Sequence, residues 1–172
     1  DAVARGVAQC PPVPGRFEVL GRDPIVVVDY AHSADALVRT CDSARTLVSG
    51  RLIVVFGAGG GSSPDKRGPM GEAVGQRADL AIVTNDNPRH EDPERIAAMV
   101  REGVERGGRA QVEVRLDRAE AIERALEQAG PDDIVVVAGK GHETGQEIGG
   151  QVLPWSDREQ VLRRLGRPAP PA

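Results

Sequence analysis

The sequence predicts an α/β fold, namely a Rossmann-like, doubly wound, mostly parallel sheet with helices on both faces. The first observation is a set of short apolar runs rich in β-branched residues, typical of strands buried on both faces: 25–29, 52–56, 80–83 and 134–138. The second is the amphipathic helical pattern between these runs. This alternation of strand and helix indicates βαβ units and therefore parallel strands.

Each expected helix follows a residue that can cap it. At an N-cap, a side-chain oxygen accepts a hydrogen bond from a free backbone N–H group of the first turn. Such residues precede the helical patterns: Ser33, Asp92, Asp117 and Ser156. A Glu lies three positions after Asp117 and Ser156, and Pro93 suits the first helical position after Asp92. We therefore expect a capped helix after each of these residues.

Shorter segments at 17–20 and 151–154 are expected as edge strands near the two ends of the chain. The second would form a hairpin turned by Gly149 and Gly150. Proline-rich residues separate the start of the chain from this pattern. We expect three parts: the tail of a preceding domain with a hinge at 1–16, one domain at 17–166, and a loose tail at 167–172.

Composition excludes several classes of protein. The chain has 172 residues, a net charge of −4 and only four aromatic residues, so it offers neither a phosphate-tracking patch nor a base-stacking surface for nucleic acid. Two cysteines are too few for a disulfide framework, which favours a reducing, cytoplasmic setting. No apolar stretch has the length of a membrane span. We therefore expect small-molecule substrates, and neither nucleic acid nor membrane as partners.

Polar loops follow the four predicted strands at what would be one edge of the sheet. They are 29–32, 57–67, 85–89 and 139–143. In open α/β sheets, ligands bind at the carboxyl ends of the strands, so convergence of these loops predicts a binding crevice. The chain contains only two lysines, Lys66 and Lys140, and both lie in glycine-rich loops. That placement hints at specific chemistry.

The third of these loops, Asn85-Asp86-Asn87-Pro88-Arg89, is the most informative. Pro88 restricts its own backbone and that of Asn87, so the polar groups are held in place. Arg89 offers a planar fork for a carboxylate or phosphate, while Asp86 and Asn87 suit a cationic group. The loop is therefore suited to a small zwitterion or anion. An Asx-Pro turn that merely precedes a helix is the alternative.

The glycine-rich loop at 57–67 fails the two common nucleotide fingerprints. Lys66 is followed by Arg67 rather than Ser or Thr, which excludes a P-loop, and Ser62 stands where a dinucleotide fingerprint requires its third glycine. Its backbone N–H groups could still cradle an anion beside Lys66 and Arg67. A flexible turn with solvated cations is the alternative.

The histidines do not have the spacing of metal ligands, so no metal site is expected within these residues. His32 by itself is typical of a hydrogen-bonding residue at a helix entry. Around His142, the glycines at 139 and 141 would let a ligand approach the backbone, and Glu143 could hold an ammonium group.

Three motifs together resemble the carboxy-terminal domain of the Mur ligases, and most closely its MurE-type members. They are the segments 28–37, 85–89 and 138–143, and the resemblance extends over nearly the whole chain. It implies ATP-dependent amide formation, in which a substrate carboxylate is phosphorylated and an amino acid amine then attacks the acyl phosphate. The MurE-type reaction adds meso-diaminopimelate to UDP-MurNAc-L-Ala-D-Glu for peptidoglycan.

The resemblance also implies roles for individual residues. Asp29 and His32 would lie beside the nucleotide, and Lys66 and Arg67 would face phosphate groups. The residues implied to hold the amino acid are Asp86, Asn87, Arg89, Gly139 and Glu143. Arg89 would pair with the carboxylate that diaminopimelate has and lysine lacks. ATP and Mg²⁺ are implied, with the P-loop, carbamylated lysine and metal ligands expected in a central domain, so the chain alone should be inactive.

Two positions depart from the family pattern. Ser62 stands where family members usually have an arginine that touches the amino acid, and Ala34 stands where they usually have proline. The first departure leaves open a MurE-like ligase with another acceptor amino acid in another pathway. A stand-alone nucleotide- or amino-acid-binding module is a further alternative, and the failed dinucleotide fingerprint argues against an oxidoreductase.

Overall fold

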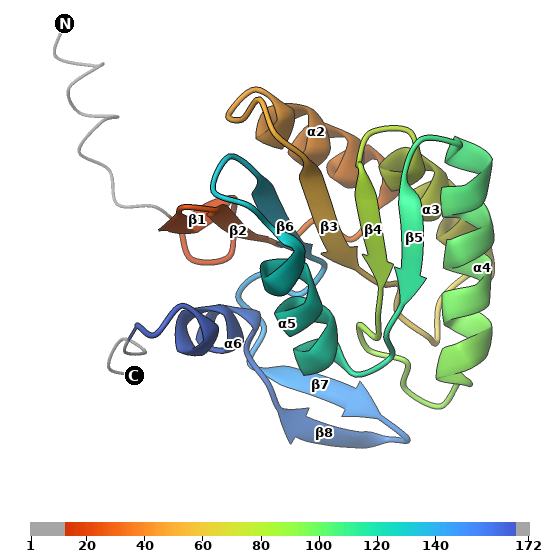
Figure 1. Ribbon diagram of the computed structural model, residues 1–172. Coiled ribbons are helices and arrows are strands. Elements are labelled where there is room, and N and C mark those ends of the chain that lie inside the picture. The colour runs from red at the N-terminus through yellow and green to blue at the C-terminus, as the bar shows by residue number, and fades with distance from the viewer. Residues whose placement is uncertain (1–12, 168–172) are drawn as a thin grey trace, which may run out of the picture.

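The computed structural model describes residues 13–167, and within them a single six-stranded sheet lies between two layers of helices (Figure 1). The strand order is β1-β2-β6-β3-β4-β5, and all neighbouring strands are parallel except β1 and β2. The predicted fold class is confirmed. Our expectations for residues 1–12 and 168–172 lie outside the described part of the chain.

The four apolar runs form the four central strands, as predicted: β2 (Ile25–Asp29), β6 (Ile134–Ala138), β3 (Leu52–Phe56) and β4 (Leu80–Val83). The edge strand β1 (Glu18–Arg22) was also expected. The opposite edge, β5 (Gln111–Val114), was not, because its side chains are only half-buried or exposed and show no continuous apolar run.

The segment 151–154 forms a strand in the expected hairpin, but not at an edge of the main sheet. β7 (Gly145–Ile148) and β8 (Gln151–Pro154) pair with each other as a separate antiparallel sheet, and Ile148 also forms an isolated bridge with Arg89. In Figure 1 this hairpin lies below the carboxyl ends of β3, β4 and β5, whose arrowheads point toward it. The hairpin is therefore placed beside the loops that follow the strands.

The predicted caps are confirmed for four helices: α2 (Ala34–Arg45), α4 (Pro93–Gly107), α5 (Arg118–Gln128) and α6 (Asp157–Arg164). The side chain of each predicted capping residue accepts a hydrogen bond from a backbone N–H group of the first turn. These bonds satisfy donors that have no partner within the helix.

The sequence did not predict α3 (Arg67–Gly75), which follows a short 3₁₀ turn, η1 (Pro64–Lys66). Its several glycines are poor helix formers, but they let α3 pack closely against α4. A Cβ atom at Gly71 would lie 2.1 Å from the carbonyl oxygen of Val100. Close helix packing therefore explains glycines that, in the sequence, indicate a loop.

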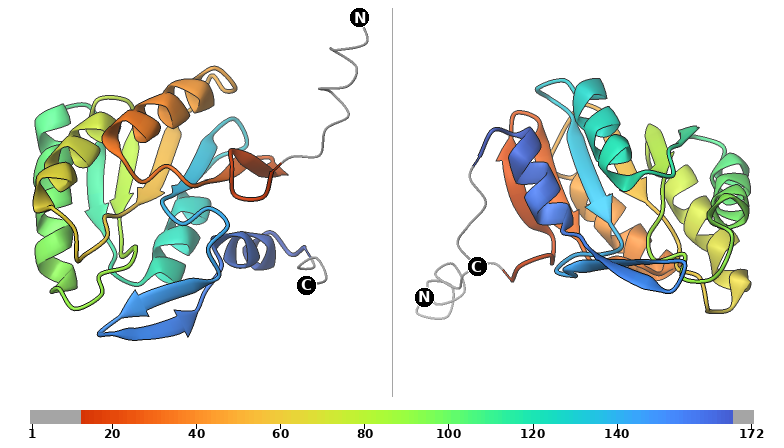
Figure 2. Two further views of the ribbon diagram at one scale, coloured as in Figure 1. Left: turned by 180° about the vertical axis from the view of Figure 1, so that it is seen from behind. Right: turned by 90° about the horizontal axis from the view of Figure 1, so that it is seen from below.

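The helices cover both faces of the sheet (Figure 2). Side chains from α2, α3 and α4 share one core with Val27, Val54 and Val136, whereas those of α5 and α6 share another with Val26 and Val135. Alternate residues of each central strand thus enter opposite cores. Because both faces are covered, ligands reach the sheet only at its edges, and the carboxyl edge carries the polar loops.

Candidate amino-acid and nucleotide site

The loops after β2, β3, β4 and β6 converge on one cavity of about 210 Å³, as the sequence predicted. Its walls are formed by Tyr30, His32, Gly59, Lys66, Asp86, Asn87, Arg89, Gly139 and Glu143. Seven of these nine residues are among the nine predicted from the sequence, and the exceptions are Tyr30 and Gly59. The strand ends bring together residues that are more than a hundred positions apart in the sequence.

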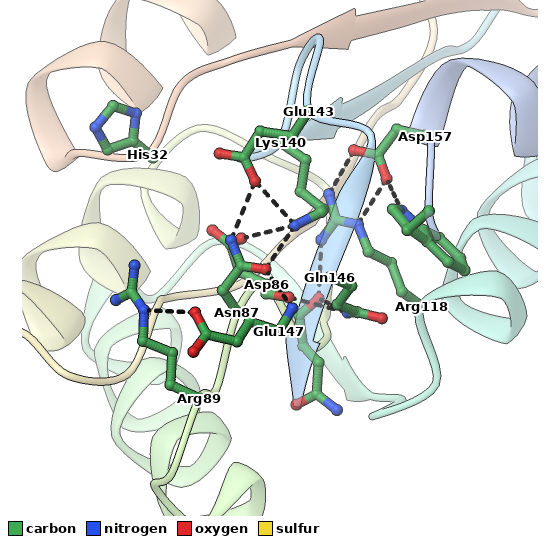
Figure 3. Close-up of polar contacts among 12 residues, drawn as sticks. His32, Asp86, Asn87, Arg89, Arg118, Lys140, Glu143, Gln146, Glu147 and Asp157 are labelled. Atoms are coloured by element: carbon green, nitrogen blue, oxygen red, sulfur yellow. Dashed lines mark hydrogen bonds and ion pairs between the residues drawn. The ribbon is translucent and has the colours of Figure 1, made fainter. Parts of the chain in front are cut away.

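Lys140 is the cation at the centre of this site (Figure 3). Its side chain is fully buried, and Nζ donates hydrogen bonds to Asn87 Oδ1 at 2.8 Å and Glu143 Oε2 at 3.1 Å. Nζ also lies 3.6 Å from Asp86 Oδ1. A buried ammonium group requires such partners, and in turn it holds their side chains in place. The sequence singled out Lys140 as a rare lysine but gave no indication of this role.

Asp86 is a buried acid in the wall of the cavity. Burial raises the pKa of its carboxyl group above the usual value, and the positive charges of Arg118 and Lys140 oppose part of that rise. An incoming ammonium group would act in the same direction as these cations, because it favours the charged form of Asp86. The arrangement therefore suits an ammonium-bearing ligand.

A second buried ion pair supports the site from behind. Arg118 and Asp157 are both fully buried, with Nη2 2.7 Å from Oδ2. Arg118 also donates to the carbonyl oxygens of Ala138 at 2.8 Å and Asn85 at 3.1 Å, which are the last residue of β6 and the second residue after β4. One guanidinium thus joins two of the site's loops to α6. Sequence reasoning missed it because its partners lie far away in the chain.

The loop at 85–89 is bound to the hairpin by backbone hydrogen bonds. The Arg89 N–H group donates to the Glu147 carbonyl at 3.0 Å, and the Arg89 carbonyl accepts from Gly149 N–H at 2.7 Å. The Glu147 N–H group donates to Asn87 Oδ1 at 3.0 Å. Arg89 has a left-handed backbone, with φ of 55°, which these bonds hold in place. The predicted cluster is therefore rigid, and β7 supplies part of that rigidity.

The side chain of Arg89 lines the cavity but is neither buried nor unpaired. Nε donates to Glu147 Oε2 at 3.1 Å, Nη1 donates to the Gly60 carbonyl, and the side chain is 43% exposed. The fork is thus near a position where a ligand carboxylate could approach, with a counter-ion already beside it.

The expected anion cradle in the glycine-rich loop needs correction. The Gly60 N–H group donates to the Asn87 carbonyl at 2.8 Å, and the Gly61 N–H group donates to Glu91 Oε1 at 2.6 Å. These groups join the loop to the segment after β4 and are not available to an anion. Lys66, in contrast, lines the cavity as expected.

Arg67 is buried in an ion pair. Its side chain is 1% exposed, and Nη2 lies 2.8 and 2.9 Å from the two carboxylate oxygens of Glu91. The guanidinium therefore pairs with Glu91 and does not line the cavity, and its contact with phosphates stays a prediction. Its partner lies 24 positions further along the chain, so the local sequence did not reveal the ion pair. The sequence instead suggested that Arg67 shares the role of the adjacent Lys66.

Asp29 does not line the cavity either. Its carboxylate accepts hydrogen bonds from Phe17 N–H at 2.7 Å, Ala31 N–H at 3.0 Å and Thr40 Oγ1 at 2.8 Å. These bonds hold the loop after β2 to its neighbours, and the contact of Asp29 with a nucleotide stays a prediction.

His32, in contrast, is exposed at the cavity, with Nδ1 3.0 Å from the Tyr30 carbonyl oxygen. The Tyr30 ring meets the rings of His32 and His142 at centroid distances of 4.7 and 5.2 Å. The guanidinium carbon of Arg16 lies 4.4 Å from the Tyr30 centroid. Tyr30 thus organises this side of the cavity, although the sequence gave it no role.

This fold, with its cavity at the carboxyl edge of the sheet, is that of a ligase domain: the chain belongs to the Mur ligase family, whose glutamate ligase domain it matches over residues 15–141. Among its relatives are proteins named UDP-N-acetylmuramoyl-L-alanyl-D-glutamate–2,6-diaminopimelate ligase. The one from Corynebacterium efficiens is 53% identical over 95% of this chain, and the one from Streptomyces coelicolor is 48% identical over 95%.

Solved structures agree with this assignment. A structure of a ligase of the same name has a TM-score of 0.84 and 40% identity over 96% of the chain. A Yersinia pestis folylpolyglutamate synthase/dihydrofolate synthase, solved with AMPPNP and a Mn ion, shares the fold with a TM-score of 0.59 and 22% identity over 76% of the chain. The chain spans about a third of the length of these relatives, 32% and 33% for the two sequences and 34% for the structure of the same name.

Two further features concern residues 13–167 only. No group of three or more His, Cys, Asp or Glu side chains in this part of the chain is placed to hold a metal ion. No helix within it is both long and apolar enough to cross a membrane.

Proposed function

We propose that this chain is the amino-acid-selecting and ATP-closing domain of a MurE-type ligase. The complete reaction would add meso-diaminopimelate to UDP-MurNAc-L-Ala-D-Glu in peptidoglycan precursor synthesis. The observation that carries the proposal is the convergence of Asp86, Asn87, Arg89 and Glu143 on one cavity. The names of relatives that match almost the whole chain support it.

The cavity has the charges that an amino acid requires. Asp86 and Glu143 would receive an ammonium group, and the Arg89 fork would receive a carboxylate. Gly139 has a φ of +114°, and a Cβ atom there would lie 3.2 Å from Asp86 Oδ2, so glycine keeps the Asp86 carboxylate accessible. In the reaction, the other amine of the bound amino acid would attack the acyl phosphate of the muramoyl substrate, forming the amide and releasing phosphate.

ATP and Mg²⁺ fit this proposal only in part within the described residues. Lys66 lines the cavity and is the cation suited to a phosphate, while His32 and Tyr30 offer ring surfaces beside it. ATP would supply the phosphoryl group that activates the substrate carboxylate. Because residues 13–167 hold no cluster suited to a metal ion, we propose that Mg²⁺ and most of the ATP are held by other domains of the ligase.

A chimeric ligase tests this function. The last third of the Corynebacterium efficiens relative would be replaced by this chain, and ADP release would be measured with UDP-muramoyl dipeptide and either meso-diaminopimelate or lysine. We expect the chimera to release ADP only when diaminopimelate is present, and the chain alone to release none. Arg89→Ala should reduce the use of diaminopimelate about tenfold, as expected for one charge-assisted, partly exposed contact, and should spare lysine.

The control is Glu94→Gln, which changes an exposed residue of α4 outside the cavity. ADP release by the chain alone would argue against a divided site. If Arg89→Ala reduces ADP release equally with both amino acids, Arg89 maintains the shape of its loop and does not bind a substrate carboxylate.

Ser62 favours a second candidate, a MurE-like ligase with another acceptor. Ser62 is exposed and cannot supply the cation that the family usually has at this position. The same chimera, offered a panel of amino acids, distinguishes the two candidates. A better acceptor than diaminopimelate would support the second.

A further inference from the structure

We infer that Glu147 is an internal competitor for the substrate's distal carboxylate, and that it sets how strictly the pocket prefers a diamino dicarboxylic acid to a diamino monocarboxylic acid. This inference rests on the proposed function. It concerns a residue of the β7–β8 hairpin that the sequence did not single out, and whose side chain lies at the Arg89 fork in Figure 3.

The geometry places the Glu147 carboxylate where a ligand carboxylate would compete with it. Oε2 lies 3.1 Å from Arg89 Nε, and the two side chains are 33% and 43% exposed. Glu147 is outside the set of residues that line the cavity, whereas Arg89 belongs to it. The pair therefore joins the cavity to a neighbouring hollow, which Glu147 lines together with Asn87, Glu143 and Val152.

The side chain and the backbone of Glu147 have separable roles. Its backbone N–H and C=O groups bind Asn87 Oδ1 and Arg89 N–H, and they hold the hairpin to the loop whatever side chain is present. Its carboxylate makes only the contact with Arg89 among its side-chain hydrogen bonds within residues 13–167. A change from Glu to Gln should therefore remove the charge and leave the hairpin in place.

The consequence for specificity follows from charge balance. A dicarboxylic ligand brings its own anion to Arg89 and must displace Glu147 or share the fork with it, which weakens binding. A monocarboxylic ligand such as lysine brings no such anion. Because Glu147 already neutralises Arg89, lysine binding leaves no unpaired cation and is not disfavoured on that account. Glu147 thus reduces the discrimination that Arg89 alone would provide. It also provides a counter-ion in a pocket that lacks the second arginine at position 62.

Binding to the 172-residue chain tests the inference directly. The dissociation constants of meso-diaminopimelate and L-lysine would be measured by NMR titration for the wild type, Glu147→Gln and, as the charge-matched control, Glu94→Gln. We expect Glu147→Gln to tighten diaminopimelate binding about threefold and to weaken lysine binding. The ratio of the two constants should then rise by about fivefold, the modest size expected for a partly exposed pair.

The control should leave the ratio unchanged, and 0.5 M salt should shrink the effect of Glu147→Gln. An unchanged ratio in Glu147→Gln, with both amino acids bound at the cavity, would overturn the role of Glu147 while leaving the proposed function intact. If neither amino acid perturbs the cavity of the wild type, the proposed function fails, and the inference fails with it. Retained amide shifts of the hairpin would show that the variant keeps its fold.

Discussion

At the scale of single residues, Lys140 has the largest effect on the site, because one buried ammonium group holds the side chains of three residues. Replacing it with methionine keeps most of the length of the side chain but leaves the carboxylates of Asp86 and Glu143 without this cation. We expect Lys140→Met to lower the free energy of unfolding by about 3 kcal/mol, the cost of removing one partner of a buried pair. Urea unfolding, monitored by circular dichroism, measures this free energy.

Two further variants separate the charge effect from a packing effect. Lys66→Met removes a half-buried lysine of the same cavity and should change stability little. Glu143→Gln added to Lys140→Met should recover part of the loss, because fewer unpaired charges remain near Asp86. If Lys140→Met is as stable as the wild type, the network does not depend on its cation.

The sequence located the individual site residues better than it defined their roles. Asp86, Asn87, Arg89, Gly139 and Glu143 were predicted, because their loops follow recognisable strands and carry a family motif. The roles of Arg67 and Asp29 stay predictions, but neither side chain lines the cavity. Their ion pair and hydrogen bonds to distant segments leave no trace in local sequence. Arg118 was missed, and Lys140 was singled out only as a rare lysine, because both are defined by partners in distant segments.

At the scale of secondary-structure elements, strands buried on both faces and capped helices were predictable, because both leave local patterns. β5 and α3 were not. β5 is an edge strand with little apolar content, and α3 uses glycines for close packing with α4. Tertiary packing outweighs local propensity in both elements.

Asp79 joins several elements at the amino-terminal edge of the sheet. Its carboxylate accepts hydrogen bonds from Leu52 N–H at 2.8 Å, Arg45 Nη2 at 2.6 Å and Arg109 Nη2 at 2.8 Å. Burial opposes ionisation, but the hydrogen bonds from Arg45, Leu52 and Arg109 outweigh it and lower the pKa of Asp79 from 3.8 to about 2. Asp79 therefore stabilises the fold in its charged form.

The contribution of Asp79 to stability depends on pH. Because the pKa of Asp79 is lower in the folded state, this contribution is complete above about pH 4 and is lost as the pH falls toward 2. We expect Asp79→Asn to lower the free energy of unfolding by about 1 kcal/mol at pH 7, allowing for solvent screening of a partly exposed group. The difference in free energy of unfolding between Asp79→Asn and the wild type should become smaller as the pH falls from 4 to 2.

Asp35→Asn is the matched control, since the Asp35 side chain is 77% exposed and pairs with Arg39, four positions along the same helix. It should have little effect at any pH, as is usual for exposed pairs. A destabilisation by Asp79→Asn that stays constant from pH 7 to pH 2 would contradict the lowered pKa.

At the scale of the whole molecule, the sheet brings four distant loops to one edge, and the hairpin covers that edge from the side. The cavity is lined by the carboxylates of Asp86 and Glu143 and by the Arg89 fork, and Lys140 Nζ is buried against the two carboxylates. We propose that these charges receive an amino acid with a second carboxylate, which would bind at this edge of the sheet.

The most direct test is to map that position on the chain itself. Amide signals of the ¹⁵N-labelled chain would be followed during titration with meso-diaminopimelate, for the wild type and for Arg89→Ala. We predict saturable shifts concentrated at 86–89, 139–143 and the β7 strand, with about tenfold weaker binding in Arg89→Ala. Shifts that cluster elsewhere, or that are the same in Arg89→Ala, would contradict the assignment of this cavity to the amino acid.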